Sequence, residues 1–191
     1  MTILTLNTDP HGCLAVTCSP IQITSTGLEK ARQIISTLKE TVRPLLPAAG
    51  LASTQIGLKE QVFVFSWDRS EENLCGAINP SFEPLGEDKE HGWEACFSTI
   101  SGDGPYRIAY VPRYKKIAAH YLNEQGQEIH QILENFAARV FQHEYDHLQG
   151  LVNIQRPDAQ TKVFSTRDEL VAFTNEVKKN DQVWYTPPLS L

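Results

Sequence analysis

The sequence predicts an α+β fold of antiparallel or mixed β-sheets, with one helix near the N-terminus and others towards the C-terminus. Three observations support this class. An apolar face recurs at helical spacing early in the chain, the middle is rich in short strand-like segments, and a long stretch without Pro or Gly follows them. Because helices and strands are grouped rather than alternating, a βαβ architecture is not expected.

The first helix is expected from Thr24 to Arg43, where apolar residues recur on one face. These residues are Leu28, Ala31, Ile35, Leu38 and Val42. Pro44 and Pro47 end the helix. A segment of small residues bounded by glycines follows at 50–57, and it leads into a strand over 61–66.

Short strands fill the middle of the chain. Residues 77–80 end one strand, and β-rich segments follow at 106–111, 116–121 and 128–133. The turn at 123–126 has the sequence Asn-Glu-Gln-Gly and joins the last two strands as a hairpin.

Two helices are expected after the strands. Residues 134–149 contain neither Pro nor Gly and stop at Gly150, which is typical of a helix end. A last helix begins at Thr166, whose spacing to Glu169 fits a capping box. The tail, which contains Pro187-Pro188, is expected to be loosely held.

Length and composition indicate an ordinary globular protein. We expect a single domain over residues 1–191, with a core over about 1–160 and a C-terminal helix and tail over 161–191. The net charge of −6 argues against nucleic acid binding. No apolar run reaches the ~18 residues that span a bilayer. Because no Lys or Arg precedes Lys30, a signal or transit peptide is not expected, and a cytoplasmic location is predicted.

The cysteines and most histidines form no pattern of their own. Cysteines are sparse and lack a C-x-x-C pair, so thiols rather than disulfides are expected. They are Cys13, Cys18, Cys75 and Cys96. Four histidines show no motif and are expected to be surface or hydrogen-bonded residues: His11, His91, His120 and His130.

The most informative segment is His143-Glu144-Tyr145-Asp146-His147. On a helix, His143 and His147 project from the same face, so both imidazoles can reach one metal ion. Glu144 can then reach a metal-bound water without being a ligand. The motif is short, but the preceding turns are apolar, and buried ionisable groups are costly unless they are paired or coordinated. We therefore expect a metal site here.

The third ligand stays open from spacing alone. A catalytic site of this type needs three protein ligands and one open position. His147 is the last histidine, so the downstream candidates are Glu169 and Glu176, whereas Cys96 is the upstream candidate.

Three ordered segments resemble the signature motifs of the peptide deformylase family, and the resemblance covers roughly residues 1–160. The resemblance implies that family's fold, with β-sheets around a central metal-binding helix. The segments Gly50 to Gly57, Glu94 to Ser98 and Gln142 to Leu148 are similar to G-L-A-A-P-Q-I-G, E-G-C-L-S and Q-H-E-x-D-H-L.

The resemblance implies that Cys96, His143 and His147 hold one divalent metal ion, with water in the fourth position. Fe²⁺ is the usual native ion of the family, and Zn²⁺ or Ni²⁺ substitute for it. Glu144 would move the water proton to the leaving amine.

The implied reaction removes the formyl group from the formyl-methionine of new polypeptides and releases formate. The Gln55 side chain and the Phe97 backbone N–H would stabilise the oxyanion, and Gly50 would bind the extended peptide. These substrates emerge at the ribosome exit region, which is therefore a candidate place of action.

Several positions depart from the family pattern without removing a catalytic group. Ser53 and Thr54 replace Ala and Pro, and Phe97 replaces Leu. Ala95 replaces a Gly and would strain the backbone if this position required a positive φ. We interpret the chain as an active but divergent enzyme.

Further side chains are candidates around the site. Arg107 and Arg139 are candidate substrate-binding residues, and Arg139 precedes His143 by one helical turn, where it can pair with Glu94 or a substrate carbonyl. Arg113 is expected to form a salt bridge to Glu94, and Asp146 is a candidate to orient a ligand histidine.

Two other functions remain as alternatives. One is a zinc endopeptidase with Glu169 or Glu176 as third ligand. The other is a non-catalytic relative that binds formylated N-termini, against which the presence of Glu144 and Gln55 argues.

Overall fold

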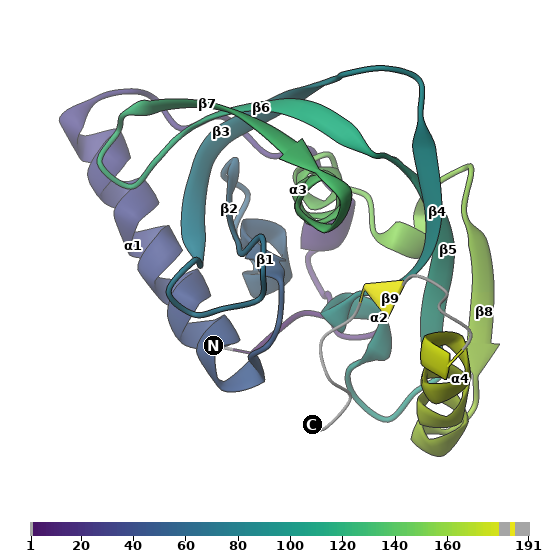
Figure 1. Ribbon diagram of the computed structural model, residues 1–191. Coiled ribbons are helices and arrows are strands. Elements are labelled where there is room, and N and C mark those ends of the chain that lie inside the picture. Colours follow the sequence, from purple (N-terminus) through teal and green to yellow (C-terminus); the bar gives the residue numbers. More distant parts are fainter. Residues whose placement is uncertain (1, 180–183, 186–191) are drawn as a thin grey trace.

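A computed structural model describes residues 2–179 and 184–185 of the chain (Figure 1). The α-helices are α1 (Ser25–Val42), α2 (Phe97–Ile100), α3 (Asn135–Leu148) and α4 (Arg167–Lys179). The strands are β1 (Gly50–Ala52), β2 (Val62–Phe65), β3 (Cys75–Pro84), β4 (Lys89–Ala95), β5 (Tyr106–Tyr114), β6 (Lys116–Leu122), β7 (Glu128–Glu134), β8 (Gln160–Phe164) and β9 (Trp184–Tyr185). Short 3-10 helices lie at Cys13–Ala15, Arg43–Leu45, Ser53–Ile56 and Asn153–Gln155.

The strands form two sheets with α3 between them (Figure 1). The five-stranded sheet has the order β1-β2-β3-β6-β7, and the four-stranded sheet has the order β8-β5-β4-β9. Neighbouring strands are antiparallel except β4 and β9, which are parallel. Helices do not alternate with strands along the chain as they would in a βαβ fold, so the predicted α+β class is confirmed.

Helix α1 forms where the apolar periodicity predicts it. Its N-cap is Thr24, whose side chain accepts a hydrogen bond from the Gly27 backbone N–H at 3.1 Å. Its inward face packs against β1 and β2 in one apolar cluster. Burial of that face, rather than helix propensity, supplies most of the helix's stability.

Helix α3 is central because it is buried on more than one side. Phe141 is fully buried and packs edge-to-face against Phe63 at 5.1 Å and Phe65 at 5.4 Å between ring centroids. The sheet side of α3 is thus anchored in aromatic packing, and its other side is free to carry polar groups.

The predicted hairpin and last helix are also found. The turn at 123–126 joins β6 to β7. The capping box of α4 is present, since the Thr166 hydroxyl accepts from the Glu169 N–H at 3.3 Å and the Glu169 carboxylate accepts from the Thr166 N–H at 3.2 Å. The expectation of a loose tail at Pro187-Pro188 concerns residues outside those described. No helix in the described part of the chain is long and apolar enough to cross a membrane.

The strand content differs from the prediction in two ways. Strand β3 does not stop at Pro80 but continues to Pro84, because the ladder shifts register between Ile78 and Ser81. Asn79 takes a positive φ of 50° at this irregularity, and its amide bonds to the backbone of Ile21. Strands β1, β4, β8 and β9 were not predicted, because β1 and β9 are only three and two residues long and β4 and β8 show no apolar–polar alternation.

Candidate active site

Three potential metal ligands converge between β4 and α3. Cys96 is the N-cap residue of α2 and directly follows β4, whereas His143 and His147 lie one turn apart on α3. One ligand atom from each lies within 4.8 Å of the others, and Cys96 Sγ is 3.2 Å from His147 Nε2. A tetrahedral ion would hold a sulfur and a nitrogen ligand about 3.5 Å apart. The three side chains therefore fit a single ion.

The candidate downstream ligands do not join this cluster. Glu169 caps α4 and accepts hydrogen bonds from Ser165 and Thr166. Glu176 is exposed on the same helix. Among the described residues, the third potential ligand beside His143 and His147 is the thiol of Cys96.

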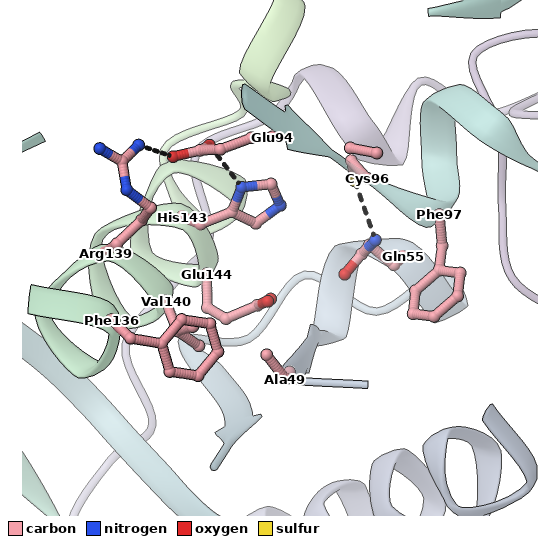
Figure 2. Close-up of a pocket in the computed structure, with 12 residues that line it drawn as sticks. Ala49, Gln55, Glu94, Cys96, Phe97, Phe136, Arg139, Val140, His143 and Glu144 are labelled. Atoms are coloured by element: carbon pink, nitrogen blue, oxygen red, sulfur yellow. Dashed lines mark hydrogen bonds and ion pairs between the residues drawn. The ribbon is translucent and has the colours of Figure 1, made fainter. Parts of the chain in front are cut away.

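Glu94 orients the first histidine. Its Oε2 lies 2.9 Å from His143 Nδ1, so Nε2 of the ring is left to face the cluster (Figure 2). Glu94 also accepts two hydrogen bonds from Arg113, at 3.0 and 2.9 Å, and one from Arg139 at 2.6 Å. Burial opposes its ionisation, but the Arg113 guanidinium and His143 hold the pKa of Glu94 well below its usual range.

The buried ionic network extends from Glu94 to the surface. Arg113 pairs with Glu94, as predicted, and also with Asp146 at 2.5 Å. Asp146 continues the network to Arg156 at 3.0 Å. Asp146 was the sequence candidate for orienting a ligand histidine, but the structure gives that contact to Glu94.

Glu144 points into the pocket beside the cluster (Figure 2). Its side chain is buried, and its Oε2 has no hydrogen-bond partner among the described residues. Burial raises the pKa of this carboxyl to about 7. A buried carboxylate with an unused oxygen is available to bind and carry a proton.

Gly50 leaves the space that Glu144 occupies. A Cβ at this position would lie 2.6 Å from Glu144 Oε1 and 2.8 Å from its Cγ, which is closer than real Cβ contacts allow. The glycine therefore has a steric function that its backbone angles do not reveal. Sequence reasoning identified Gly50 only as a backbone contact.

The Gln55 amide group is fixed beside Cys96. Its Nε2 donates to Ser98 Oγ at 3.2 Å and lies 3.4 Å from Cys96 Sγ, while its Oε1 accepts from the Ala52 N–H at 2.9 Å. Phe97 is the first residue of α2, so its N–H is one of the donors that a helix does not use itself. Ser98 was missed by sequence reasoning, although it belongs to the second motif.

Apolar side chains complete the pocket. Figure 2 shows Phe136 and Val140 on one side and Phe97 on the other, with Ala49 between them, and Glu94, His143 and Cys96 above them in the view. Such a pocket suits an apolar side chain placed next to a polar group.

The two candidate substrate-binding arginines have different environments. Arg139 lines the pocket, but it is buried and directs its guanidinium to Glu94 and to the carbonyls of Glu90 and Val111. Its pairing with Glu94 confirms one of the two predicted contacts. Arg107 lies on β5, is not among the residues that line this pocket, and donates to the Pro105 carbonyl at 3.5 Å.

The departures from the motifs fit without strain. Ala95 lies in extended β4 opposite Ile108, so its Cβ is compatible with the backbone there. Thr54 uses a hydroxyl that proline lacks and donates to the His147 carbonyl at 3.4 Å. These residues retain the positions of Gln55 and Cys96.

Comparisons with known proteins agree on one family. The polypeptide deformylase family model matches residues 3–163. Peptide deformylase 2 of Ralstonia nicotianae is 40% identical over 54% of this chain and 60% of its own length. The peptide deformylase of Fusobacterium nucleatum is 33% identical over 81% of this chain and 85% of its own. The crystal structure of peptide deformylase from Thermotoga maritima superposes with a TM-score of 0.66 at 30% identity, covering 81% of this chain and 95% of that one.

Proposed function

The chain belongs to the polypeptide deformylase family, and we propose that it hydrolyses the N-formyl group of formyl-methionine on newly made polypeptides, using one divalent metal ion held by Cys96, His143 and His147. One observation carries this proposal beyond family membership. The buried Glu144 carboxylate keeps an oxygen without a partner beside the converging Cys-His-His cluster. A structural metal site would not need such a group.

The donor set suits the ions proposed for it. One thiolate and two imidazoles favour Fe²⁺, Zn²⁺ or Ni²⁺ over Mg²⁺ or Ca²⁺, and we assign Fe²⁺ as the native ion with the other two as substitutes. When bound, such an ion acidifies a water molecule and polarises a carbonyl. Glu94 fixes the ring of His143 for this purpose.

Glu144 moves the proton in the proposed reaction. Water adds to the formyl carbon, and the unpaired Oε2 accepts the water proton. The same proton then passes to the amine nitrogen as the C–N bond breaks. The products are formate and a free N-terminal methionine.

The oxyanion and the peptide are bound by neighbouring groups. The Gln55 Nε2 and the Phe97 N–H stabilise the developing negative charge on the formyl oxygen. Gly50 lies on β1, the edge strand of the five-stranded sheet, where backbone groups can pair with an extended peptide. The apolar walls of Phe97 and Phe136 receive the methionine side chain.

The arginines have a supporting function in this proposal. Arg139 holds Glu94, which in turn holds His143, so Arg139 acts through the ligand rather than on substrate. Arg107 lies outside the residues that line the pocket, so this mechanism gives it no contact with substrate. The endopeptidase alternative has no support, because Glu169 is used as a helix cap.

The substrate indicates where the enzyme acts. Formylated N-termini exist on chains leaving the ribosome, so we assign its action to the cytoplasm near the exit region.

The test is formate release from a formyl-Met-Ala-Ser peptide by protein prepared anaerobically with Fe²⁺. Glu144→Ala and Glu144→Gln should lower the rate by about 10²–10⁴-fold with unchanged metal content, because general acid–base catalysis contributes about that factor. Glu83→Ala, which alters an exposed glutamate of β3, should retain full activity. Absence of formate release from metal-replete protein would contradict the proposal.

A further inference from the structure

A second pair of histidines lies on the outer face of the five-stranded sheet. His120 on β6 and His130 on β7 are direct partners in the antiparallel ladder. Ala119 and Tyr121, their neighbours along β6, are buried in the core. Because side chains alternate along a strand, His120 and His130 both project from the opposite, outer face.

The two imidazoles converge through the same ring atom. Nδ1 of His120 and Nδ1 of His130 are 2.5 Å apart, with ring centroids at 4.6 Å and planes at 77°. A single hydrogen can lie between the two nitrogens. The His130 side chain is 62% exposed, whereas His120 is half-buried, so the His130 ring has room to rotate.

We propose that His120 and His130 form a second site, for a borderline divalent transition-metal ion such as Zn²⁺, Ni²⁺ or Cu²⁺. Two nitrogen ligands at 2.0–2.1 Å from one ion lie about 2.9–3.4 Å apart. The observed nitrogens are closer than this by less than about 1 Å. Small rotations of the exposed rings reach the binding geometry without moving the strands.

Neighbouring groups favour a cation at this position. Glu128 lies two residues before His130 on the same face, and its Oε2 is 3.7 Å from His130 Nε2. Ser81 on β3 is opposite His120 in the next ladder and, with Asn79, lines the same hollow. The carboxylate lies on the Nε2 side of the His130 ring, so it adds favourable charge and orients the ring without coordinating an ion held between the two Nδ1 atoms. Water can complete the coordination of that ion.

The chemistry of the pair selects the class of ion. Imidazole suits Zn²⁺, Ni²⁺ and Cu²⁺, whereas Mg²⁺ and Ca²⁺ require oxygen ligands. With two protein nitrogens and high exposure, the pair binds more weakly than the cluster of Cys96, His143 and His147. It shares no lining residue with the pocket of that cluster. The chain should therefore bind a second, readily exchanged ion.

Equilibrium dialysis of tag-free Ni²⁺ holoenzyme against rising free Ni²⁺ tests this inference. Bound metal is measured by elemental analysis. Because the same ion is used throughout, exchange at the first site does not change the measured number of ions per chain. We expect a second saturable equivalent that is lost in both His120→Ala and His130→Ala. His91→Ala, which alters an exposed histidine of β4, should keep it.

Two further readouts separate this site from the catalytic one. Glu128→Gln should weaken the second equivalent without abolishing it, and formate release should be equal in all these proteins. Circular dichroism melts confirm that each variant is folded. Absence of a second equivalent at saturating Ni²⁺, or its persistence in both His120→Ala and His130→Ala, overturns the proposal whether or not the chain proves to be a deformylase.

Discussion

The two histidine pairs of this molecule place the same ligand type in opposite surroundings. His143 and His147 lie one turn apart on a buried helix, whereas His120 and His130 face each other across two exposed strands. The ring of His143 is held by Glu94, and Glu94 is in turn held by two arginines. The rings of the second pair contact each other, and His130 also contacts the exposed carboxylate of Glu128.

The difference lies in what surrounds the ligands. A metal site keeps its geometry when the residues behind the ligands are themselves constrained. The buried site also gains a thiolate from Cys96 and a carboxylate, Glu144, that can move protons. The exposed pair has no thiolate, and its neighbouring carboxylate, Glu128, is exposed to solvent, so the pair should bind an ion without acting on a substrate.

The largest effect on metal binding and activity should come from removing the thiolate of the buried site, which leaves two imidazoles as in the exposed pair. Cys96→Ala leaves two imidazoles, so we expect loss of the stoichiometric ion on dialysis and loss of formate release with it. Elemental analysis and the peptide assay measure both. Cys75→Ala, at a half-buried thiol on β3, is the matched control and should retain the ion. Retention of metal and activity by Cys96→Ala would reject Cys96 as a ligand.

Glu94→Gln removes the constraint behind the ligand and leaves the ligands in place. It leaves Arg113 and Arg139 with less compensating charge in the interior, so the free energy of unfolding should fall by about 3–5 kcal/mol in urea. Metal affinity should fall about 10–100-fold.

The control is an exposed ion pair of the same chemical type. Glu71→Gln removes the charge that pairs with Arg43, and both side chains of this pair are more than half exposed. The free energy of unfolding should therefore fall by less than about 1 kcal/mol. Equal destabilisation by the two variants would show that the buried network does not constrain the site.

Gly50→Ala should separate proton transfer from metal binding. The new Cβ displaces the Glu144 carboxylate, and a shift of about 1 Å can cost about 10²-fold in rate. Metal content should not change. A rate within a few-fold of wild type would mean that Glu144 tolerates movement.

The smallest effect should come from the exposed pair. His120→Ala and His130→Ala should each change the free energy of unfolding by no more than about 0.5 kcal/mol, since exposed side chains contribute little to stability. Urea titration without added metal measures this. A larger loss would indicate that the contact between the two imidazoles itself stabilises the sheet.

Local patterns account for the elements that the sequence predicts. Helices α1 and α3, the hairpin at 123–126 and the capping box of Thr166 depend on residues within a turn or two of one another. Strand β4 is different, because Glu94 is buried in the core although its charged side chain indicates a surface position. Its burial makes sense only with Arg113 and Arg139, which come from other elements.

Spacing along the chain is enough to predict the ligand helix, the motif residues and the family that they resemble. Three further features become visible only in the folded chain: the carboxylate that orients His143, the reason why Gly50 must lack a side chain, and the contact of His120 with His130. Each of these is a contact between segments whose relative position depends on strand register and packing. Such contacts leave no periodic signal in the sequence, since the partners can lie at any separation along it.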